Sequence, residues 1–175
     1  MNYILFDNNY RYYYKLKHLY EHAFPSEERP PLSMLLEMSN SSMYAVEDNG
    51  EFVGLVSTVN YSDLVYIFFL AVKKRYRHKG YGTRILKDIN DKYADKRIFL
   101  LAEDPDIPSD NQEERNNRIK FYNHNGMKVT GNKVTEYGVD YIFLSNGKDV
   151  SKEDFLKVME YITGDFFPIY TSHVK

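Results

Sequence analysis

The chain has 175 residues, of which 43% are hydrophobic and 27% are charged, and its formal net charge is −2. These values predict one globular domain over residues 1–175, and they exclude a disordered chain or a general electrostatic attraction to nucleic acid or anionic membranes. The chain has no cysteine, which excludes disulfide bonds, thiolate metal sites and a cysteine nucleophile.

The sequence gives no sign of export or of membrane insertion. Its start, MNYILFDNNYRYYYK, lacks the basic beginning and the long apolar stretch of a signal peptide. The longest apolar run, LVYIFFLAV at 64–72, is too short to cross a bilayer as a helix. We therefore expect a cytoplasmic protein that has no membrane partner.

The N-terminal segment predicts a strand followed by two helices. Asp7 or Asn8 is expected to cap the first helix, because short polar side chains accept hydrogen bonds from the first free N–H groups. Tyr13, Leu16 and Tyr20 recur at helical spacing in that helix. The elements expected here are a strand at 2–6, a helix at 10–24, a proline-containing loop at 25–31 and a short helix at 32–38.

The middle of the chain predicts a hairpin and then a strand–helix–strand unit. Asn49-Gly50 separates two alternating strands and is the dipeptide that a two-residue type I′ turn prefers. The run at 64–72 is apolar on both faces, as expected of a strand inside a sheet. The elements expected are strands at 42–48, 51–61 and 64–72, a helix at 80–94 and a strand at 97–103.

The C-terminal part predicts a polar loop, a helix, two closing strands and a last helix. Gly126 is expected to end the helix at 114–125, because glycine readily takes the left-handed conformation that follows many helices. The closing strands are expected at 127–131 and 138–145, and the last helix at about 151–161. This mixture predicts an α/β or α+β fold around one mixed sheet.

A basic, glycine-containing connection joins the strand at 64–72 to the helix at 80–94. The first N–H groups of a helix have no partner within the helix and form the positive end of its dipole. Gly80 and Gly82 remove side chains that would keep an anion away from these groups. The connection therefore predicts a pyrophosphate site, with a simple basic turn as the alternative. Its cationic residues are Lys73, Lys74, Arg75, Arg77, His78 and Lys79.

Two motifs then resemble the GNAT superfamily of N-acetyltransferases. RHKGYG at 77–82 is similar to that family's Arg/Gln-x-x-Gly-x-Gly/Ala signature, and NNRIKFYNHNGM at 116–127 resembles its second signature. The resemblance covers roughly residues 40–145. It implies a central mixed, mostly antiparallel sheet of about six to seven strands with helices on both faces. It also implies acetyl-CoA as a co-substrate and no metal.

The resemblance assigns residues to the acetyl-CoA site. The pantetheine arm is expected along Leu70, Ala71 and Val72, with a backbone N–H near Leu70 polarising the thioester carbonyl. Asn116 is expected to contact the same arm, although a register shift would give this place to Arg115 or Asn117. The pyrophosphate is expected on the backbone of Arg77, His78, Lys79, Gly80, Tyr81, Gly82 and Thr83.

The catalytic groups implied by the resemblance are a general acid and a general base. Tyr122 falls at the general-acid position beside the coenzyme sulfur, with a core tyrosine as the alternative. Many relatives have a glutamate on the fourth strand, where this chain has Tyr66. Glu103 is then the best candidate for the base; Glu27, Glu28, a water chain or loss of the proton to bulk solvent are the alternatives. Arg29 is expected either to bind an acidic group of the acceptor or to be a solvated loop charge.

The sequence therefore predicts an N-acetyltransferase that moves an acetyl group from acetyl-CoA to a primary amine by direct transfer in a ternary complex. The alternative is a non-catalytic acyl-CoA-binding sensor or interaction module with the same fold. The acceptor is open between a small amine, an amino sugar, a polyamine and a peptide amine. The segment HLYEH at 18–22 also matches an inverted zinc-protease pattern, an alternative that we set aside because such proteases are much larger. We expect no nucleic-acid partner, and a homodimer is possible through the apolar segment TGDFFPIY.

Overall fold

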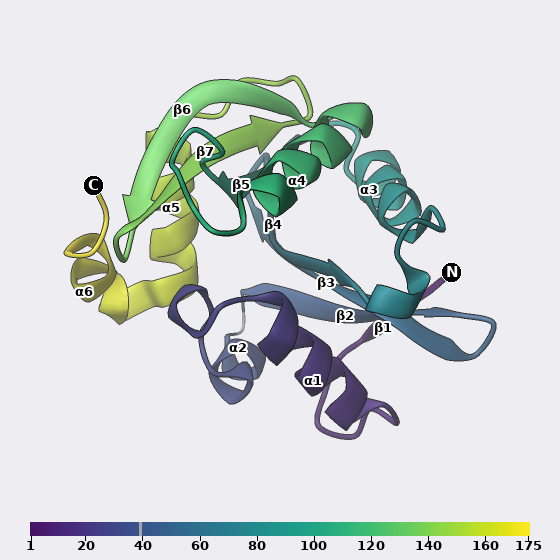
Figure 1. Cartoon of the computed structure of the whole chain (residues 1–175). Helices are drawn as coiled ribbons and strands as arrows, with labels where there is room; N and C mark the ends of the chain where they lie inside the picture. Colours follow the sequence, from purple (N-terminus) through teal and green to yellow (C-terminus); the bar gives the residue numbers. More distant parts are fainter. Residues whose placement is uncertain (39) are drawn as a thin grey trace. The chain divides into compact units, whose positions relative to one another are not determined.

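A computed structural model describes residues 1–38 and 40–175, apart from the side chain of Glu27. Seven strands form one sheet in the order β1-β2-β3-β4-β5-β7-β6 (Figure 1). The strands are β1 (Asn2–Leu5), β2 (Ser41–Asp48), β3 (Glu51–Tyr61), β4 (Leu64–Val72), β5 (Arg97–Glu103), β6 (Lys128–Glu136) and β7 (Val139–Ser145). The helices are α1 (Tyr13–Ala23), α2 (Leu32–Glu37), α3 (Tyr81–Lys92), α4 (Gln112–His124), α5 (Lys152–Thr163) and α6 (Phe167–Thr171).

The strand pairing confirms a mixed, mostly antiparallel sheet. β4 and β5 pair in parallel through Leu64–Tyr66 and Arg97–Phe99. The pairs β1–β2, β2–β3, β5–β7 and β6–β7 are antiparallel. No helix in the described part of the chain is long and apolar enough to cross a membrane.

The described residues form two compact units. The first contains Met1–Val59 and Ile67–Ile89, and the second contains Asn60–Tyr66 and Asn90–Lys175. β3, β4 and α3 therefore contribute residues to both units. A single domain over the whole chain stays a prediction.

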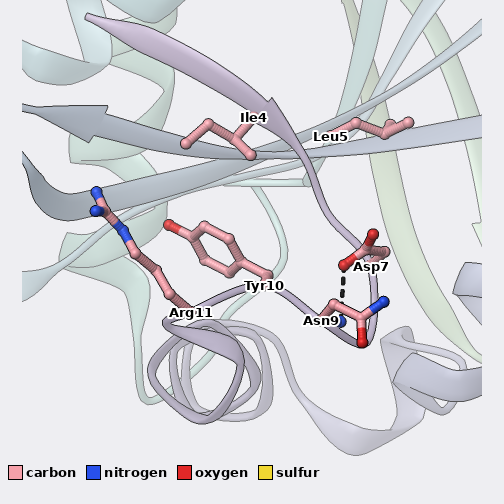
Figure 2. Close-up of a pocket in the computed structure, with 6 residues that line it drawn as sticks. All are labelled: Ile4, Leu5, Asp7, Asn9, Tyr10 and Arg11. Carbon is pink, nitrogen blue, oxygen red and sulfur yellow. Dashed lines mark hydrogen bonds between the residues drawn. The ribbon is translucent and has the colours of Figure 1, made fainter.

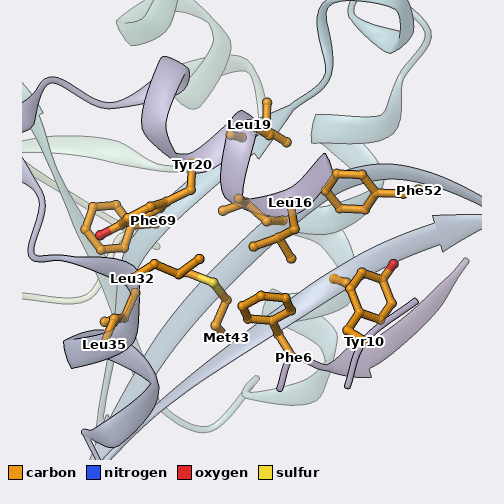
Figure 3. Close-up of a cluster of buried hydrophobic side chains, with 13 residues drawn as sticks. Phe6, Tyr10, Leu16, Leu19, Tyr20, Leu32, Leu35, Met43, Phe52 and Phe69 are labelled. Atoms are coloured by element: carbon orange, nitrogen blue, oxygen red, sulfur yellow. The ribbon is translucent and has the colours of Figure 1, made fainter. Parts of the chain in front are cut away.

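The first unit is built around the predicted hairpin. Asn49 and Gly50 both have positive φ, 50° and 78°, which is the type I′ conformation expected of this dipeptide. In Figure 1, α1 and α2 lie on one side of β1–β3, and α3 lies on the other. Figure 3 shows the buried cluster beneath α1 and α2, where Leu16 and Tyr20 are fully buried as the helical spacing predicted. The hairpin and its helices thus form one hydrophobic core.

In the second unit, α5 packs against β7 and the start of β4. Phe155 of α5 meets the Phe143 ring edge-on at 5.6 Å and the Tyr66 ring at 5.9 Å. Tyr66 in turn stacks on Phe99 at 4.8 Å. Edge-on and offset rings of this kind are the favourable arrangements of aromatic pairs. Tyr66 is therefore a packed core tyrosine.

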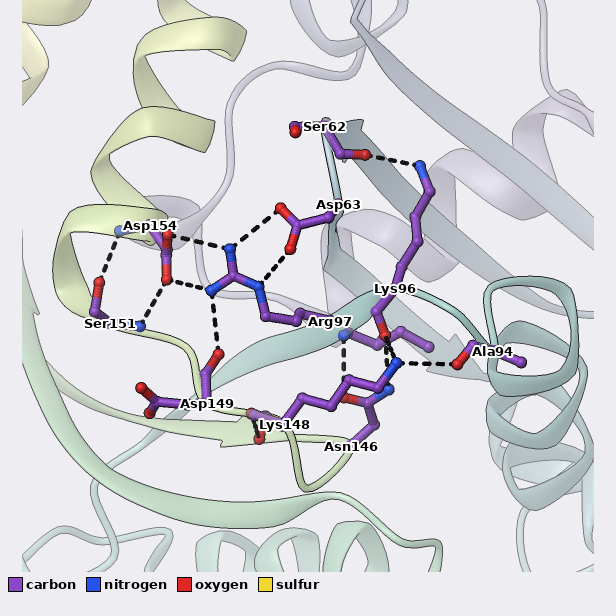
Figure 4. Close-up of polar contacts among 12 residues, drawn as sticks. Ser62, Asp63, Ala94, Lys96, Arg97, Asn146, Lys148, Asp149, Ser151 and Asp154 are labelled. Carbon is purple, nitrogen blue, oxygen red and sulfur yellow. Dashed lines mark hydrogen bonds and ion pairs between the residues drawn. The ribbon is translucent and has the colours of Figure 1, made fainter.

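Arg97 joins three segments of the second unit (Figure 4). Its guanidinium donates to Asp63 at 2.7 Å, to Asp154 at 2.6 Å and to the carbonyl oxygen of Asp149 at 3.2 Å. The hydrogen bonds from Arg97 lower the pKa of Asp63. A carboxyl group with a lowered pKa stabilises the folded state only while it is ionised. The stability that Asp63 contributes is therefore lost as the pH falls through the acid range.

Several ends of elements differ from the expectations. β6 runs on to Glu136, although a strand at 127–131 was expected. Asp7 does not cap α1: its Oδ1 accepts a hydrogen bond from the N–H of Asn9 at 2.7 Å, and α1 begins only at Tyr13. This local Asx turn competes with helix capping for the same acceptor. In the C-terminal tail, α6 begins at Phe167, with Pro168 in its first turn, where proline's missing N–H costs nothing.

Candidate functional site

The predicted pyrophosphate connection lies between β4 and α3, within the first unit. His78 and Gly80 have positive φ values of 60° and 80°, and α3 begins directly afterwards at Tyr81. The first hydrogen bond of this helix runs from the N–H of Arg84 to the carbonyl oxygen of Gly80 at 3.0 Å. The N–H groups of Tyr81, Gly82 and Thr83 precede this bond, and at the start of a helix such groups are available to an anion.

Side chains hold this connection in place. The Nε of Arg77 donates to the carbonyl oxygen of Val72 at 3.2 Å, which folds the connection back on the end of β4. The Tyr81 hydroxyl donates to Asp48 at 3.0 Å, and this hydrogen bond raises the pKa of Tyr81. Arg75 donates to Glu51 at 2.8 Å. The start of α3 is thus tied to the β2–β3 hairpin, and its N–H groups are fixed before any ligand arrives.

The charge near this connection is positive. Lys73 has a lowered pKa because it is partly buried and because Arg75 and Lys15 lie nearby. Its Nζ lies 5.4 Å from the centre of the Phe52 ring. Lys79 and Arg75 both lie over the Tyr76 ring. Several cations beside free helix N–H groups suit a diphosphate.

The end of β4 depends on a glycine that the sequence analysis did not identify. A Cβ on Gly54 of β3 would lie 2.5 Å from the carbonyl oxygen of Ala71 and 3.3 Å from the Cα of Val72. The N–H of Lys73 also donates to the carbonyl oxygen of Val53 at 2.9 Å. Gly54 therefore allows β3 to approach the strand segment that is expected to bind the pantetheine arm. A glycine in the interior of a predicted strand was the available signal.

We expect Gly54→Ala to weaken both the fold and acetyl-CoA binding. The new methyl group forces β4 away near Ala71, at a cost of about 1–3 kcal/mol of unfolding free energy. The displaced strand is expected to lose roughly tenfold in acetyl-CoA affinity, about 1.4 kcal/mol. Thermal unfolding and calorimetric titration measure the two effects.

Gly50→Ala is the matched control for this change. A Cβ there meets no atom within 4 Å, but the φ of +78° strains an alanine by about 1 kcal/mol. This variant is expected to lose stability and to keep its acetyl-CoA affinity. Equal affinity losses in both variants would show that general instability, and not the position of β4, causes the effect.

Glu103 lies at the end of β5 in the second unit, where it is almost completely buried. One of its carboxylate oxygens accepts from Arg115 at 2.7 Å and the other accepts from Arg118 at 2.9 Å. Arg115 also donates to the carbonyl oxygen of Asp104 at 3.3 Å. Both arginines belong to α4, so Glu103 fixes the helix that contains Tyr122 to the end of β5.

Tyr122 and Asn116 lie on the same helix, α4. Tyr122 is buried, with 8% of its surface exposed, and burial raises the pKa of its hydroxyl. Within the described residues, this hydroxyl has no hydrogen-bond partner. Asn116 is exposed. Tyr122 therefore has a protonated hydroxyl with no hydrogen-bond partner in the described part of the protein.

The remaining expected site residues fall in different parts of the chain. Residues 70–83 belong to the first unit, whereas Glu103, Asn116 and Tyr122 belong to the second. The side chain of Glu27 lies outside the part of the chain that the structure describes, and Glu28 ends the 3-10 turn at Ser26–Glu28. The arginine partners of Glu103 were not predicted. The available signal was that Arg115 and Arg118 are three residues apart, so that both lie on one face of the predicted helix.

The HLYEH segment forms part of α1. His18 and His22 lie one helical turn apart with ring centres 3.9 Å from each other. A ring nitrogen of His22 is 2.8 Å from the carbonyl oxygen of His18. Among residues 1–38 and 40–175, no group of three histidine or acidic side chains is arranged to hold a metal ion. The zinc-protease reading therefore gains no support.

A cavity of about 490 Å³ lies beside β1 and the segment that leads into α1 (Figure 2). Two of its polar side chains, those of Tyr10 and Arg11, contact Glu47. The Tyr10 hydroxyl donates to buried Glu47 at 2.7 Å, and Arg11 forms an ion pair with the same carboxylate. Burial, followed by the contact with Glu47, raises the pKa of Tyr10. These contacts hold the N-terminal segment on β2.

Comparison with known proteins identifies a matching family model and solved structures of the same fold. The acetyltransferase (GNAT) family model matches residues 10–127, more than half of the chain. A GNAT-family structure from Bacteroides thetaiotaomicron is 18% identical, covers 97% of this chain and 98% of its own, and has a TM-score of 0.76. No curated protein matches the sequence.

Two further solved structures have the same fold. An aminoglycoside 6′-N-acetyltransferase from Enterococcus faecium is 20% identical, with 83% of this chain and 96% of that chain covered and a TM-score of 0.59. A GNAT family acetyltransferase from Elizabethkingia anophelis, solved with acetyl-CoA bound, is 16% identical, with coverages of 82% and 95% and a TM-score of 0.57. At these identities the likeness is one of fold, and it agrees with the fold that the two motifs implied.

Proposed function

Because the chain belongs to the GNAT family of acetyltransferases, we propose that it moves the acetyl group of acetyl-CoA directly to a primary amine while both substrates are bound. The chain has no cysteine, so no thiol is present to hold the acetyl group between two half-reactions. The observation that supports this function best is the connection at 73–80, which ends on the free N–H groups of α3.

The pyrophosphate of acetyl-CoA is proposed to bind the backbone of Arg77–Thr83. The N–H groups of Tyr81, Gly82 and Thr83 donate to its oxygens, and the nearby lysines and arginines offset its charge. A relative of the same fold contains bound acetyl-CoA, which supports the choice of ligand. The pantetheine arm then follows Leu70–Val72, and Asn116 contacts it.

The reaction places three demands on the protein. A neutral amine attacks the thioester carbonyl carbon, a C–N bond forms and the C–S bond breaks, so the nitrogen loses a proton and the sulfur gains one. The backbone N–H near Leu70 is proposed to donate to the carbonyl oxygen, where negative charge develops. Tyr122 is proposed to give its proton to the departing thiolate.

We propose that Glu103 acts through Arg115 and Arg118, as a positioning residue for α4. Each carboxylate oxygen of Glu103 already accepts a hydrogen bond from a guanidinium. Neither oxygen is therefore free to act on the amine alone. The amine proton then leaves through water to bulk solvent, which needs no further side chain. This assignment differs from the role as general base that the resemblance implied for Glu103.

Glu103→Gln separates these two roles. Positioning predicts a loss of about 2–3 kcal/mol of unfolding free energy, because a buried carboxylate with two guanidinium partners is removed. It also predicts a pH profile of kcat/KM with the same shape as that of the original protein. Asp106→Asn, at an exposed carboxylate in the loop that follows β5, is the control. A stable variant that loses about 10²-fold in turnover together with its acidic limb would make Glu103 the base.

Calorimetric titration of acetyl-CoA and CoA, followed by a thiol-release assay over mixed primary amines, tests the proposed function. Micromolar binding with CoA release is the expected result. Binding without release from any amine would favour a non-catalytic acyl-CoA sensor. No binding would overturn the function, because the connection at 73–80 would then be a basic turn only.

A further inference from the structure

A second cavity, of about 370 Å³, lies in the first unit between α1 and the segment leading into α2. Pro30 and Pro31 restrict this segment, and the Tyr20 hydroxyl donates to the carbonyl oxygen of Pro30 at 2.8 Å. The N–H of Glu28 donates to the carbonyl oxygen of Pro25 at 3.1 Å. The wall of this cavity is therefore held in one conformation by contacts within the unit.

Arg29 is the cation of this wall. Its Nε donates to the carbonyl oxygen of Phe24 at 3.0 Å, and its guanidinium lies 5.6 Å from the centre of the Tyr20 ring. These two contacts orient the guanidinium plane. In the described part of the chain, its two terminal nitrogens have neither a hydrogen-bond nor an ion-pair partner. A fixed guanidinium with two unused nitrogens matches the two oxygens of a carboxylate.

The other lining residues add one further cation, one acid and several hydroxyl groups. Lys17 and Glu21 lie one helical turn apart on α1, with 3.9 Å between the charged atoms. This pair offsets its own charge, so the lining residues that the structure describes have a net charge of +1, from Arg29. Tyr13, Ser26 and Ser33 line the cavity with hydroxyl groups, and Pro31 and Leu32 complete it. The described part of the lining is therefore polar and positive.

Aromatic contacts connect this cavity to β4. The Tyr20 ring meets the Phe69 ring edge-on at 5.2 Å, and the Phe24 ring meets it at 4.7 Å. Phe69 directly precedes Leu70, where the proposed thioester carbonyl is polarised. The Tyr20 ring therefore contacts both Arg29 and Phe69 of β4, the strand that is proposed to hold the acetyl group.

We propose that this cavity binds a carboxylate of the acceptor, so that the acceptor is an amine that also contains a carboxylate. The inference rests on the proposed function. Arg29 makes the paired contact to the two carboxylate oxygens, and Lys17 and the serine hydroxyls complete the site. A polycationic amine without a carboxylate meets a like charge at Arg29 and is disfavoured.

Matched acceptors test the inference by CoA release with acetyl-CoA at saturation. The probes are 6-aminohexanoate and its amide, a set of amino acids and their amides, phosphoethanolamine, and spermidine as a polycation. We expect kcat/KM to be at least about tenfold higher for a carboxylate than for its amide. A charge-assisted hydrogen bond between Arg29 and the carboxylate accounts for a difference of this size. A preference for the amides, phosphoethanolamine or spermidine would overturn the inference.

Arg29→Gln and Arg29→Lys then assign the preference to this residue. Arg29→Gln is expected to raise KM for carboxylates about 10- to 100-fold and to leave kcat and the values for amides nearly unchanged. Arg29→Lys keeps the charge but loses the fork, so it is expected to recover only part of the preference. Lys157→Gln removes an exposed cation of α5, in the second unit, and is the control. An unchanged ratio of carboxylate to amide in Arg29→Gln would overturn the inference.

The two proposals fail in different ways. Calorimetry of acetyl-CoA on the same samples tests the proposed function without any acceptor. If acetyl-CoA binds and amides are acetylated as well as carboxylates, the function stands and the carboxylate site is wrong. If acetyl-CoA binds but no carboxylate-containing amine releases CoA, the carboxylate site is again wrong. If acetyl-CoA does not bind, the proposed function itself is wrong.

Discussion

Gly82→Glu is expected to abolish acetyl-CoA binding, with a loss in affinity of at least about 100-fold, or 2.7 kcal/mol. Gly82 lies in the first turn of α3, two residues after Gly80, which precedes the helix. A glutamate there adds negative charge and bulk where the pyrophosphate is proposed to accept hydrogen bonds. Like charges placed together at a binding site cost several kcal/mol.

The same change is expected to leave the fold intact. A carboxylate in the first turn of a helix stabilises that helix by about 0.3–1 kcal/mol, because it faces the positive end of the dipole. Loss of affinity with an unchanged unfolding temperature would therefore report on the ligand site alone. Asn8→Glu, at an exposed turn of the same unit, adds the same charge away from the connection and is the control. An affinity of Gly82→Glu within about threefold of the original would refute the placement, since that is under 1 kcal/mol.

Tyr122→Phe is expected to lower kcat by about 10²-fold while the acetyl-CoA affinity stays within about twofold. The change removes only the hydroxyl and keeps the buried ring, which contacts Phe121 at 5.3 Å between ring centres. Because the hydroxyl has no partner in the described part of the protein, the fold loses little stability. Stopped-flow or steady-state thiol release measures the turnover.

The pH dependence distinguishes a general acid from a packing residue here. Burial raises the pKa of Tyr122, so its hydroxyl stays protonated at neutral and moderately alkaline pH. The ratio of the original kcat to the variant kcat is therefore expected to be constant between about pH 6 and pH 9, below the usual tyrosine pKa of about 10. Tyr14→Phe, at an exposed tyrosine of α1, is expected to change nothing. Normal turnover in Tyr122→Phe would remove this residue from the mechanism.

Much of the fold was predictable because its signals are local. Asn49-Gly50 specifies its turn through the positive φ of two consecutive residues, and the all-apolar run at 64–72 specifies a strand buried on both faces. The connection at 73–80 and the helix after it were predicted from glycines, charge and spacing. Each of these signals lies within about 20 residues of sequence.

The errors in the predicted elements also have a local cause. Asp7 has the side chain of a helix cap, but the same oxygen accepts a hydrogen bond from the N–H of Asn9, two residues on. The sequence does not decide between the turn and the helix cap. In both, the Asp7 carboxylate accepts a hydrogen bond from an N–H two or three residues further along the chain. In the structure, Phe6 packs against Tyr10 and Tyr13 on either side of this turn.

The sequence by itself determined the element order, the mixed sheet, the two family motifs and the residues of the proposed pyrophosphate site. Only the tertiary structure decided that Glu103 pairs with Arg115 and Arg118, that Gly54 lies against Ala71, and that Arg29 lines a cavity beside Tyr20. The physical reason is that periodicity and turn chemistry specify which face of an element is buried. The partner that meets that face depends on strand register and packing, which residues far apart in the sequence decide together.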